Sequence, residues 1–366
     1  MSKSYGLFLT VAALVMSIVI WGNPVSKLVA AFSPTATPSG LEALSPATTE
    51  LNVAQLNLTV DESQLMAHVT ALAQPRFTLE DKVVARQYIT EQLMRYGFNP
   101  QEQRYDNSDN GAPDGVNIVA TLAGTDPAAG AIVLGAHYDT MMDSPGADDN
   151  GSAIATLLEA ARIFSTAANT LENATPANEA PLNISRSFPA RSLQLVFFDQ
   201  EEHQTEAGKG LLGSVAFTKS TATAHNIKGA VILDMIGYAC RTPGCQSYPG
   251  GLPLPDVPDT GDFLAILGLK SHTELLGAFM RSAQENWPLA LTLPIPKPTL
   301  KLFPDLLRSD HAPFWERNIP AVFVTDTANF RNPNYHTPQD TPDTLDRSFF
   351  RGSAQHVINA IATLLG

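Results

Sequence analysis

The 366-residue sequence predicts an α/β fold, a three-layer sandwich with a central mixed, mostly parallel sheet and helices on both faces. Short apolar runs alternate along the chain with longer runs whose apolar residues recur at helical spacing. This alternation is typical of strands joined by crossover helices. The apolar fraction of 44% is ordinary for a globular core, and no internal repeat divides the chain.

The folded part is expected to begin near Val60. Thr78 followed by Asp81 predicts a helix N-terminus, and Gly97 stops the apolar-periodic run that reaches Tyr96. The predicted strands are Val116 to Leu122, Ala131 to Ala136, Leu193 to Phe198, Ala230 to Ile236 and Ala321 to Val324. The further predicted helices are Gly151 to Phe164, one within Leu267 to Asn286, and Phe349 to Leu365.

The first 55 residues differ in composition from the rest. Tyr5 to Trp21 holds no charge and follows Lys3, so residues 1–22 are predicted to be a signal peptide or a short membrane anchor. Residues 23–55 are rich in Pro, Ser and Thr, which is typical of a linker. Residues 56–366 are then one folded domain, with a predicted surface-loop insertion at 165–190. We expect export, with this domain periplasmic, extracellular or anchored outside the cytoplasm.

The net charge bears on which partners the protein can bind, and the cysteine content bears on the compartment in which it works. The net charge of −13 argues against a nucleic acid partner. Cys240 and Cys245 are the two cysteines, and they flank a Pro-Gly turn. In an exported protein this spacing predicts a disulfide that closes a small loop. A zinc site is the weaker alternative, because no second Cys or His pair lies near in sequence.

Histidines and acids gather at or just beyond the predicted strand ends, and side chains from several strand ends can share one crevice. They are His137, Asp139, Asp148, Asp149, Glu201, Glu202 and Asp234, with His336 in a later motif. Asp234 interrupts an apolar run, and clustered buried carboxylates are costly unless a cation compensates them. Two imidazoles and three carboxylates suit zinc or a similar divalent ion, and one bridging carboxylate would make a two-metal site.

The motifs GAHYDT, PGADDNGSA, FFDQEE with GLLGS, LDMIGY, SDHAPFW and YHTPQDTPDTL resemble those of one enzyme family. This family, peptidase family 28, comprises the zinc-dependent aminopeptidases of the bacterial leucyl aminopeptidase and aminopeptidase Y type. It also includes the glutaminyl cyclases. The resemblance covers roughly Val60 to Gly366. It implies a zinc-exopeptidase fold with two Zn²⁺ ions, or another divalent metal. The implied ligands are His137 and Asp234 for one ion, Glu202 and His336 for the other, and Asp149 for both.

The resemblance also implies roles for the neighbouring residues. Glu201 would be the general base, and Asp139 would orient the ligand histidine two residues before it. For Asp148, capping of a helix N-terminus is the better interpretation. Asp310 and His311 would support a loop near the site. The link after the glutamate pair, HQTEAGKGLLGS, is longer than usual in the family, which affects the expected pocket wall.

The implied function is a metallo-aminopeptidase that removes the N-terminal residue of peptides. One alternative is a glutaminyl cyclase with a single zinc, and another is an inactive binding module of the same fold. A related class with an inserted lid domain is disfavoured, because the interval from Asp234 to His336 must already hold a strand and helices. Peptide substrates are the expected partners, the N-terminal segment is the one expected membrane contact, and no oligomeric state is predicted.

Overall fold

The computed structural model describes residues 58–111, 113–173, 189–202, 210–220, 226–250, 257–282 and 287–366. The predicted signal peptide or anchor and the linker lie outside the described residues. None of the described helices is both long and apolar enough to cross a membrane.

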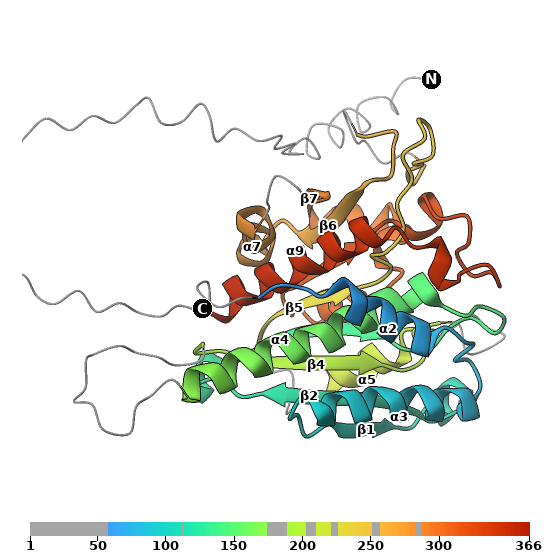
Figure 1. The fold of residues 1–366 in the computed structure, drawn as a ribbon. Coiled ribbons are helices and arrows are strands. Elements are labelled where there is room, and N and C mark those ends of the chain that lie inside the picture. The colour runs from blue at the N-terminus through green and yellow to red at the C-terminus, as the bar shows by residue number, and fades with distance from the viewer. Residues whose placement is uncertain are drawn as a thin grey trace, which may run out of the picture.

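An eight-stranded mixed sheet forms the middle layer, with strand order β1-β2-β4-β3-β5-β8-β6-β7 (Figure 1). The strands are β1 Gln101–Tyr105, β2 Gly115–Leu122, β3 Ala131–His137, β4 Ser192–Phe198, β5 Ile227–Leu233, β6 Phe263–Leu269, β7 Leu289–Ile295 and β8 Ala321–Thr325. The central strands β4, β3, β5 and β8 are parallel, while β2 pairs antiparallel with β4 and β6 pairs antiparallel with β8. The predicted mixed sheet is therefore confirmed.

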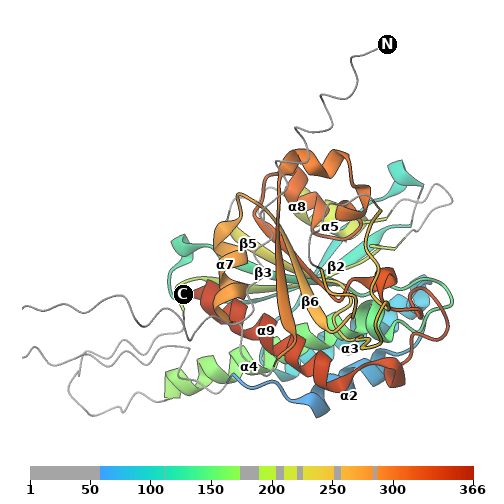
Figure 2. The same ribbon diagram turned by 90° about the horizontal axis from the view of Figure 1, so that it is seen from above.

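Helices cover both faces of the sheet (Figure 2). The helices are α2 Glu62–Leu72, α3 Leu79–Arg95, α4 Ala153–Asn173, α5 Leu212–Lys219, α7 Thr273–Ser282, α8 Ala312–Glu316 and α9 Arg347–Leu365. One face packs against α2, α3, α4, α7 and α9 in the larger apolar core. The opposite face packs against Phe217 of α5 and against Phe314 and Trp315 of α8. The three-layer arrangement follows from apolar residues on both faces of the central strands.

Helix α3 begins as its sequence predicts. Thr78 caps the helix, its hydroxyl accepting from the main chain of Asp81, whose carboxylate accepts in return. The strand predicted from Ala230 to Ile236 lies three residues closer to the N-terminus in the structure, because β5 spans Ile227–Leu233. Asp234 is consequently the first residue beyond the strand, which frees its side chain to face the carboxyl edge of the sheet.

The predicted loop at 165–190 is wrong in its first part, because α4 continues to Asn173. Ala167, Ala168 and Leu171 are buried, so the apolar stripe of α4 persists beyond Phe164. Alanine also has the highest helix propensity, which favours this extension. Residues 174–188 lie outside the described part of the chain.

Candidate metal centre

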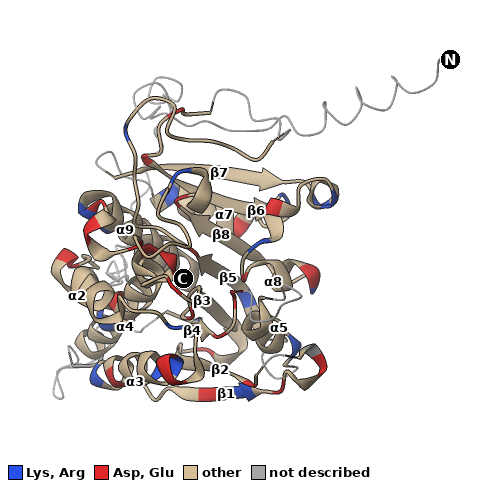
Figure 3. Ribbon diagram, turned by 90° about the vertical axis from the view of Figure 1, so that its right-hand side faces the viewer, with Lys and Arg blue, Asp and Glu red and all other residues tan. Residues whose placement is uncertain are grey.

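The predicted ligands meet at the carboxyl edge of the central parallel strands, where acidic segments lie beside β3, β4 and β5 (Figure 3). His137 is the last residue of β3, Asp234 directly follows β5, and the glutamate pair follows β4. The loop after β8 brings in His336, and the connection from β3 to α4 brings in Asp149. The topology therefore brings six side chains from five separate segments of the chain to one edge.

Backbone conformation at this edge is unusual. Gln200, Met235 and His336 adopt left-handed backbone, with φ of 59°, 54° and 60°. His336 is a ligand candidate, Met235 follows the candidate Asp234, and Gln200 precedes the glutamate pair. Such conformations are sparsely populated by residues other than glycine, and they cluster at functional sites.

Two groups of three side chains could each hold a metal ion. The first is His137, Asp149 and Asp234, and the second is Asp149, Glu202 and His336. Within each group the candidate ligand atoms lie within 4.8 Å of one another. Asp149 belongs to both groups, as expected of a carboxylate that bridges two ions.

The interatomic distances fit metal ligation. His137 Nε2 lies 3.4 Å from Asp149 Oδ1 and 3.6 Å from Asp234 Oδ1. His336 Nε2 lies 3.2 Å from Asp149 Oδ2 and 3.0 Å from Glu202 Oε1. Ligands of a tetrahedral zinc ion, about 2.0–2.2 Å from the metal, are separated from one another by roughly 3.3–3.6 Å. The His137 distances match this separation, and the His336 distances are slightly shorter.

The chemistry of the donor set also calls for a cation. Each histidine Nε2 faces two carboxylates, but a single N–H cannot donate a good hydrogen bond to both. Among the described residues, no Lys or Arg forms an ion pair with the carboxylates of either group. A divalent ion in each group would balance these charges, so the residues present fit two metals.

Three acids of the site, Asp149, Glu201 and Glu202, have shifted pKa values. Burial raises the pKa of Glu201 well above its ordinary value; His137 opposes this, and Glu202 and Asp234 reinforce it. Burial likewise raises the pKa of Glu202 to about 7, with a further contribution from Asp149. For Asp149, burial acts in the same direction, but the two histidines outweigh it and lower the pKa.

The pKa values of the two histidines are raised, whereas burial alone lowers the pKa of an imidazole. Burial lowers the pKa of His336, but Asp149 and Glu202 overcome this and raise it to about 10. For His137, burial is again outweighed, here by Glu201, Asp139, Asp149 and Asp234. Without a metal, protons on the two rings partly take the place of cations, so metal binding must displace these protons.

Asp139 joins the end of β3 to the glutamate pair. Its carboxylate accepts hydrogen bonds from the main-chain N–H groups of Glu201 and Glu202, both at 3.1 Å. His137 Nδ1 lies 3.1 Å from the main-chain oxygen of Asp139 and 3.6 Å from its carboxylate. The orienting role expected for Asp139 remains a proposal; its contact with the glutamate backbone was not foreseen.

The helix-capping role predicted for Asp148 is wrong. The helical turn at 147–152 has no side-chain cap. Instead, the buried Asp148 carboxylate accepts from Gly237 N and Asn332 Nδ2, both at 2.9 Å. Non-helical backbone at Asp149 and Asn150 separates Asp148 from the regular start of α4, so its side chain points across to the loops after β5 and β8.

Asp310 and His311 belong to neither ligand group. Both are fully buried, and His311 stacks on Phe323 with ring centroids 4.4 Å apart. The Nε2 atom of His311 lies 2.9 Å from the main-chain oxygen of Leu306. His311 thus contacts the 304–309 segment, which borders the site.

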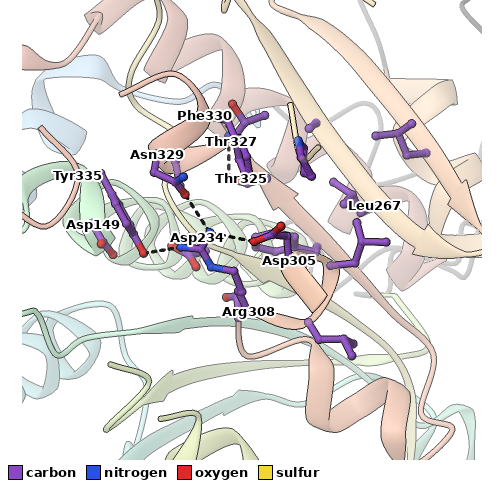
Figure 4. Close-up of a pocket in the computed structure, with 18 of the residues that line it drawn as sticks. Asp149, Asp234, Leu267, Asp305, Arg308, Thr325, Thr327, Asn329, Phe330 and Tyr335 are labelled. Atoms are coloured by element: carbon purple, nitrogen blue, oxygen red, sulfur yellow. Dashed lines mark hydrogen bonds and ion pairs between the residues drawn. The ribbon is translucent and has the colours of Figure 1, made fainter. Parts of the chain in front are cut away.

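A pocket of about 870 Å³ adjoins the ligand groups. Its floor consists of alternate, mostly apolar residues of β6, β7 and β8: Phe263, Ala265, Leu267, Leu289, Leu291, Leu293, Phe323 and Thr325. In Figure 4, Asp149 and Asp234 lie toward one end of the pocket and Leu267 toward the other. The arrangement offers a charged reaction centre next to an apolar binding surface.

Cys240 and Cys245 form the predicted disulfide. The closed loop follows β5, and main-chain hydrogen bonds join Cys240 to Gly261 in both directions. Residues 246–249, directly after the loop, line the pocket. The disulfide therefore shapes a segment that continues into the pocket wall.

The sequence analysis missed two residues that contact the segment before Asp149. They are Arg76, from the loop between α2 and α3, and Asp340. Asp340 lies inside the motif that contains His336, so its position was a usable signal. Arg76 contacts only main-chain oxygens at this segment, and such contacts leave no sequence pattern.

Comparisons with known proteins identify the family of the chain. The model of the family described as Peptidase family M28 matches residues 117–255 and 284–361, more than half of the chain. The uncharacterized protein YfbL of Escherichia coli is 31% identical over 262 residues, covering 68% of this chain and 70% of YfbL. Leucine aminopeptidase 1 of Trichophyton equinum is 26% identical over 258 residues, 68% of this chain and 57% of the fungal protein. The present chain thus matches little more than half of that protein's length.

A solved structure gives the same fold. The crystal structure of Macrostomum lignano glutaminyl cyclase superposes with a TM-score of 0.58 at 18% sequence identity. The alignment covers 90% of this chain and 96% of the cyclase chain. At this level of identity the similarity concerns the fold alone.

Proposed function

The chain belongs to peptidase family M28, and on this premise we propose that it is a dinuclear zinc aminopeptidase that removes the N-terminal residue of peptides. The observation that carries the proposal is the position of Asp149 in both ligand groups. His137 and Asp234 would complete one site, and Glu202 and His336 the other. When bound, the two ions would lower the pKa of a water molecule and polarise the scissile carbonyl.

Glu201 is the proposed general base. It is 8% exposed, lines the pocket and belongs to neither ligand group. Its carboxylate would take the proton of the attacking water and pass it to the nitrogen of the leaving amine. The hydrogen bonds from the Glu201 and Glu202 main chain to Asp139 hold the backbone that carries this side chain.

The apolar pocket supports an N-terminal residue with an apolar side chain as substrate. The strand residues that form its floor would exclude water from the side chain, and such burial contributes to binding. The matched leucine aminopeptidase of Trichophyton equinum is consistent with such a preference.

We further propose that the protein is exported. The disulfide supports this, because disulfides persist in oxidising compartments. The uncharged segment from Tyr5 to Trp21 also supports it.

A glutaminyl cyclase is the second candidate, supported by the fold shared with the Macrostomum lignano enzyme. Both activities use an N-terminal residue, so one substrate panel separates them. Purified protein is assayed with leucyl, other aminoacyl and glutaminyl substrates. Release of the N-terminal residue is expected. Cyclisation of glutamine without release of leucine would overturn the aminopeptidase proposal, and no turnover of either would favour an inactive binding module.

A further inference from the structure

The main chain just before Asp149 is held on its N–H side by Asp340. The Asp340 carboxylate accepts from Asp148 N at 2.9 Å and from Asp149 N at 3.0 Å. Its main-chain oxygen accepts from Ala147 N at 3.1 Å. Three consecutive N–H groups thus point at a single residue, which comes from the same turn as His336.

The carbonyl side of this segment is held by Arg76. Its guanidinium donates to Pro145 O at 2.8 Å and to Gly146 O at 3.0 Å. The Nε atom donates to Tyr138 O at 2.7 Å, one residue after His137. A guanidinium therefore binds the carbonyl oxygens, and a carboxyl group binds the N–H groups, of one short segment.

Both side chains are buried. Arg76 is 1% exposed and Asp340 is 0% exposed. Among the described residues, no carboxylate lies within ion-pair distance of Arg76. Burial lowers the pKa of Arg76 to about 10, and the charges of Asp340, Asp149, Asp139 and Glu202 oppose this fall. Arg76 therefore stays charged at neutral pH.

The fit around the segment is tight. Gly146 adopts a φ of 61°, which favours glycine. A Cβ atom there would lie 2.6 Å from the Arg76 guanidinium and 2.4 Å from the main-chain oxygen of Asp149. Any larger residue at this position would also clash with Thr140, 2.3 Å away, and would displace the Arg76 side chain and the backbone that carries Asp149.

We propose that Arg76 and Asp340 are positioning residues that fix residues 145–149, so that each oxygen of Asp149 faces one ligand group. The inference rests on the proposed function in that it assigns a purpose to the placement of Asp149. Arg76 would add a permanent positive charge beside the acids, and Asp340 would tie the Asp149 segment to the turn of His336. Neither residue would contact substrate.

The test compares zinc affinity among purified full-length variants. Arg76→Lys keeps the charge but loses the planar fork, Arg76→Gln loses both, and Asp340→Asn loses the charge and one acceptor. Asp343→Asn and Arg351→Gln remove exposed charges from the same loop and from α9, and serve as matched controls. Zinc affinity is measured by competition with a chelator, together with the absorption spectrum of the Co²⁺-loaded protein and the Tm of the metal-free protein.

Loss of a residue that supports metal ligands typically costs about tenfold to hundredfold in metal affinity. We expect a loss in this range for Asp340→Asn and Arg76→Gln, a smaller one for Arg76→Lys, and an altered Co²⁺ spectrum in all three. Zinc affinity and Co²⁺ spectra equal to those of the controls, with only a lower metal-free Tm, would overturn the proposal. If Asp340→Asn does not fold, Arg76→Lys provides the test. A lower zinc affinity than that of the controls supports the proposal, and an equal affinity overturns it.

The failure of this inference differs from the failure of the proposed function. Metal content and turnover of the wild-type protein test the function, whereas the ratio of variant to wild-type affinities tests the positioning role. A wild-type protein that binds zinc tightly but releases no N-terminal residue would contradict the function alone.

Discussion

The Oδ2 atom of Asp149 lies 3.2 Å from Nε2 of His336, at the junction of two loops that are distant in sequence. The other oxygen of Asp149 lies 3.4 Å from His137 Nε2. Both candidate metal sites therefore depend on one carboxylate. The adjacent acid, Asp148, faces away from both sites and binds main-chain and amide N–H groups.

Replacing Asp149 tests this division of roles. Asp149→Asn removes the charge shared by both sites, so the zinc content of the purified protein should fall sharply. Removal of a residue that supports metal ligands typically lowers metal affinity about tenfold to hundredfold. Removal of the shared ligand should lower zinc affinity by more than this. Asp148→Asn is the matched control and should retain most zinc, as measured by elemental analysis. The reverse order of effects would show that the wrong acid of the pair has been assigned to the bridge.

Glu201→Gln should separate metal binding from catalysis. Glu201 belongs to neither ligand group, so zinc content should equal that of the wild-type protein. Loss of a general base typically costs on the order of a hundredfold or more in rate, and kcat should fall by at least this factor. Glu316→Gln, at an exposed carboxylate, is the control. Near-normal turnover of Glu201→Gln would remove Glu201 from the role of base.

Reduction of the disulfide should affect substrate binding more than stability. Cys240 and Cys245 are five positions apart, and closing so short a loop contributes little entropic stabilisation. Residues 246–249 line the pocket, so reduction should change KM by more than it changes Tm. Steady-state kinetics and thermal melting with and without reductant measure the two effects. An unchanged KM with a large fall in Tm would contradict the expectation, and two free thiols in protein from its native compartment would contradict export.

The metal-free protein should lose stability as pH rises. The pKa of Glu202 is raised from 4.5 to about 7, so its ionisation between these values disfavours the folded state. The pKa of His336 is raised from 6.5 to about 10, so its contribution is complete below 6.5 and is lost by about 10. Glu202 therefore acts in the lower part of the range from about pH 5 to 8 and His336 in the upper part, and each lowers the stability as pH rises.

Zinc should reverse this trend, because metal binding competes with protons for the same ligands. The gap in Tm between zinc-loaded and metal-free protein should therefore widen as pH rises. Thermal melting of both forms across this pH range tests the expectation. A gap in Tm between the two forms that stays constant across this pH range would contradict the expected competition between metal and protons.

The sequence was most informative where burial leaves a pattern. The apolar runs of β3, β4, β5 and β8 are continuous because both faces of these strands are covered, and all four were predicted. β1, Gln101–Tyr105, is a polar edge strand without apolar alternation and was missed. β7 contains Pro294, which is tolerated at a sheet edge but argues against a strand in the sequence.

The residues of the site likewise fall into those that the sequence could predict and those that only the structure reveals. The cluster of acids and histidines was found because charged side chains at strand ends conflict with their apolar surroundings, and the family resemblance supplied the role of each residue. Arg76 could not be found, because its partners are main-chain oxygens supplied by distant segments. Asp148 was misinterpreted because an acid near a helix start predicts a cap, whereas its partners, Gly237 and Asn332, are known only from the tertiary structure.

The most direct test of the dinuclear aminopeptidase is a zinc titration of the metal-free protein, with leucyl-substrate hydrolysis followed at each step. The two ligand groups predict that binding saturates at two zinc ions per chain and that hydrolysis appears as the sites fill. Saturation at one ion per chain, with cyclisation of N-terminal glutamine and no release of leucine, would contradict the account.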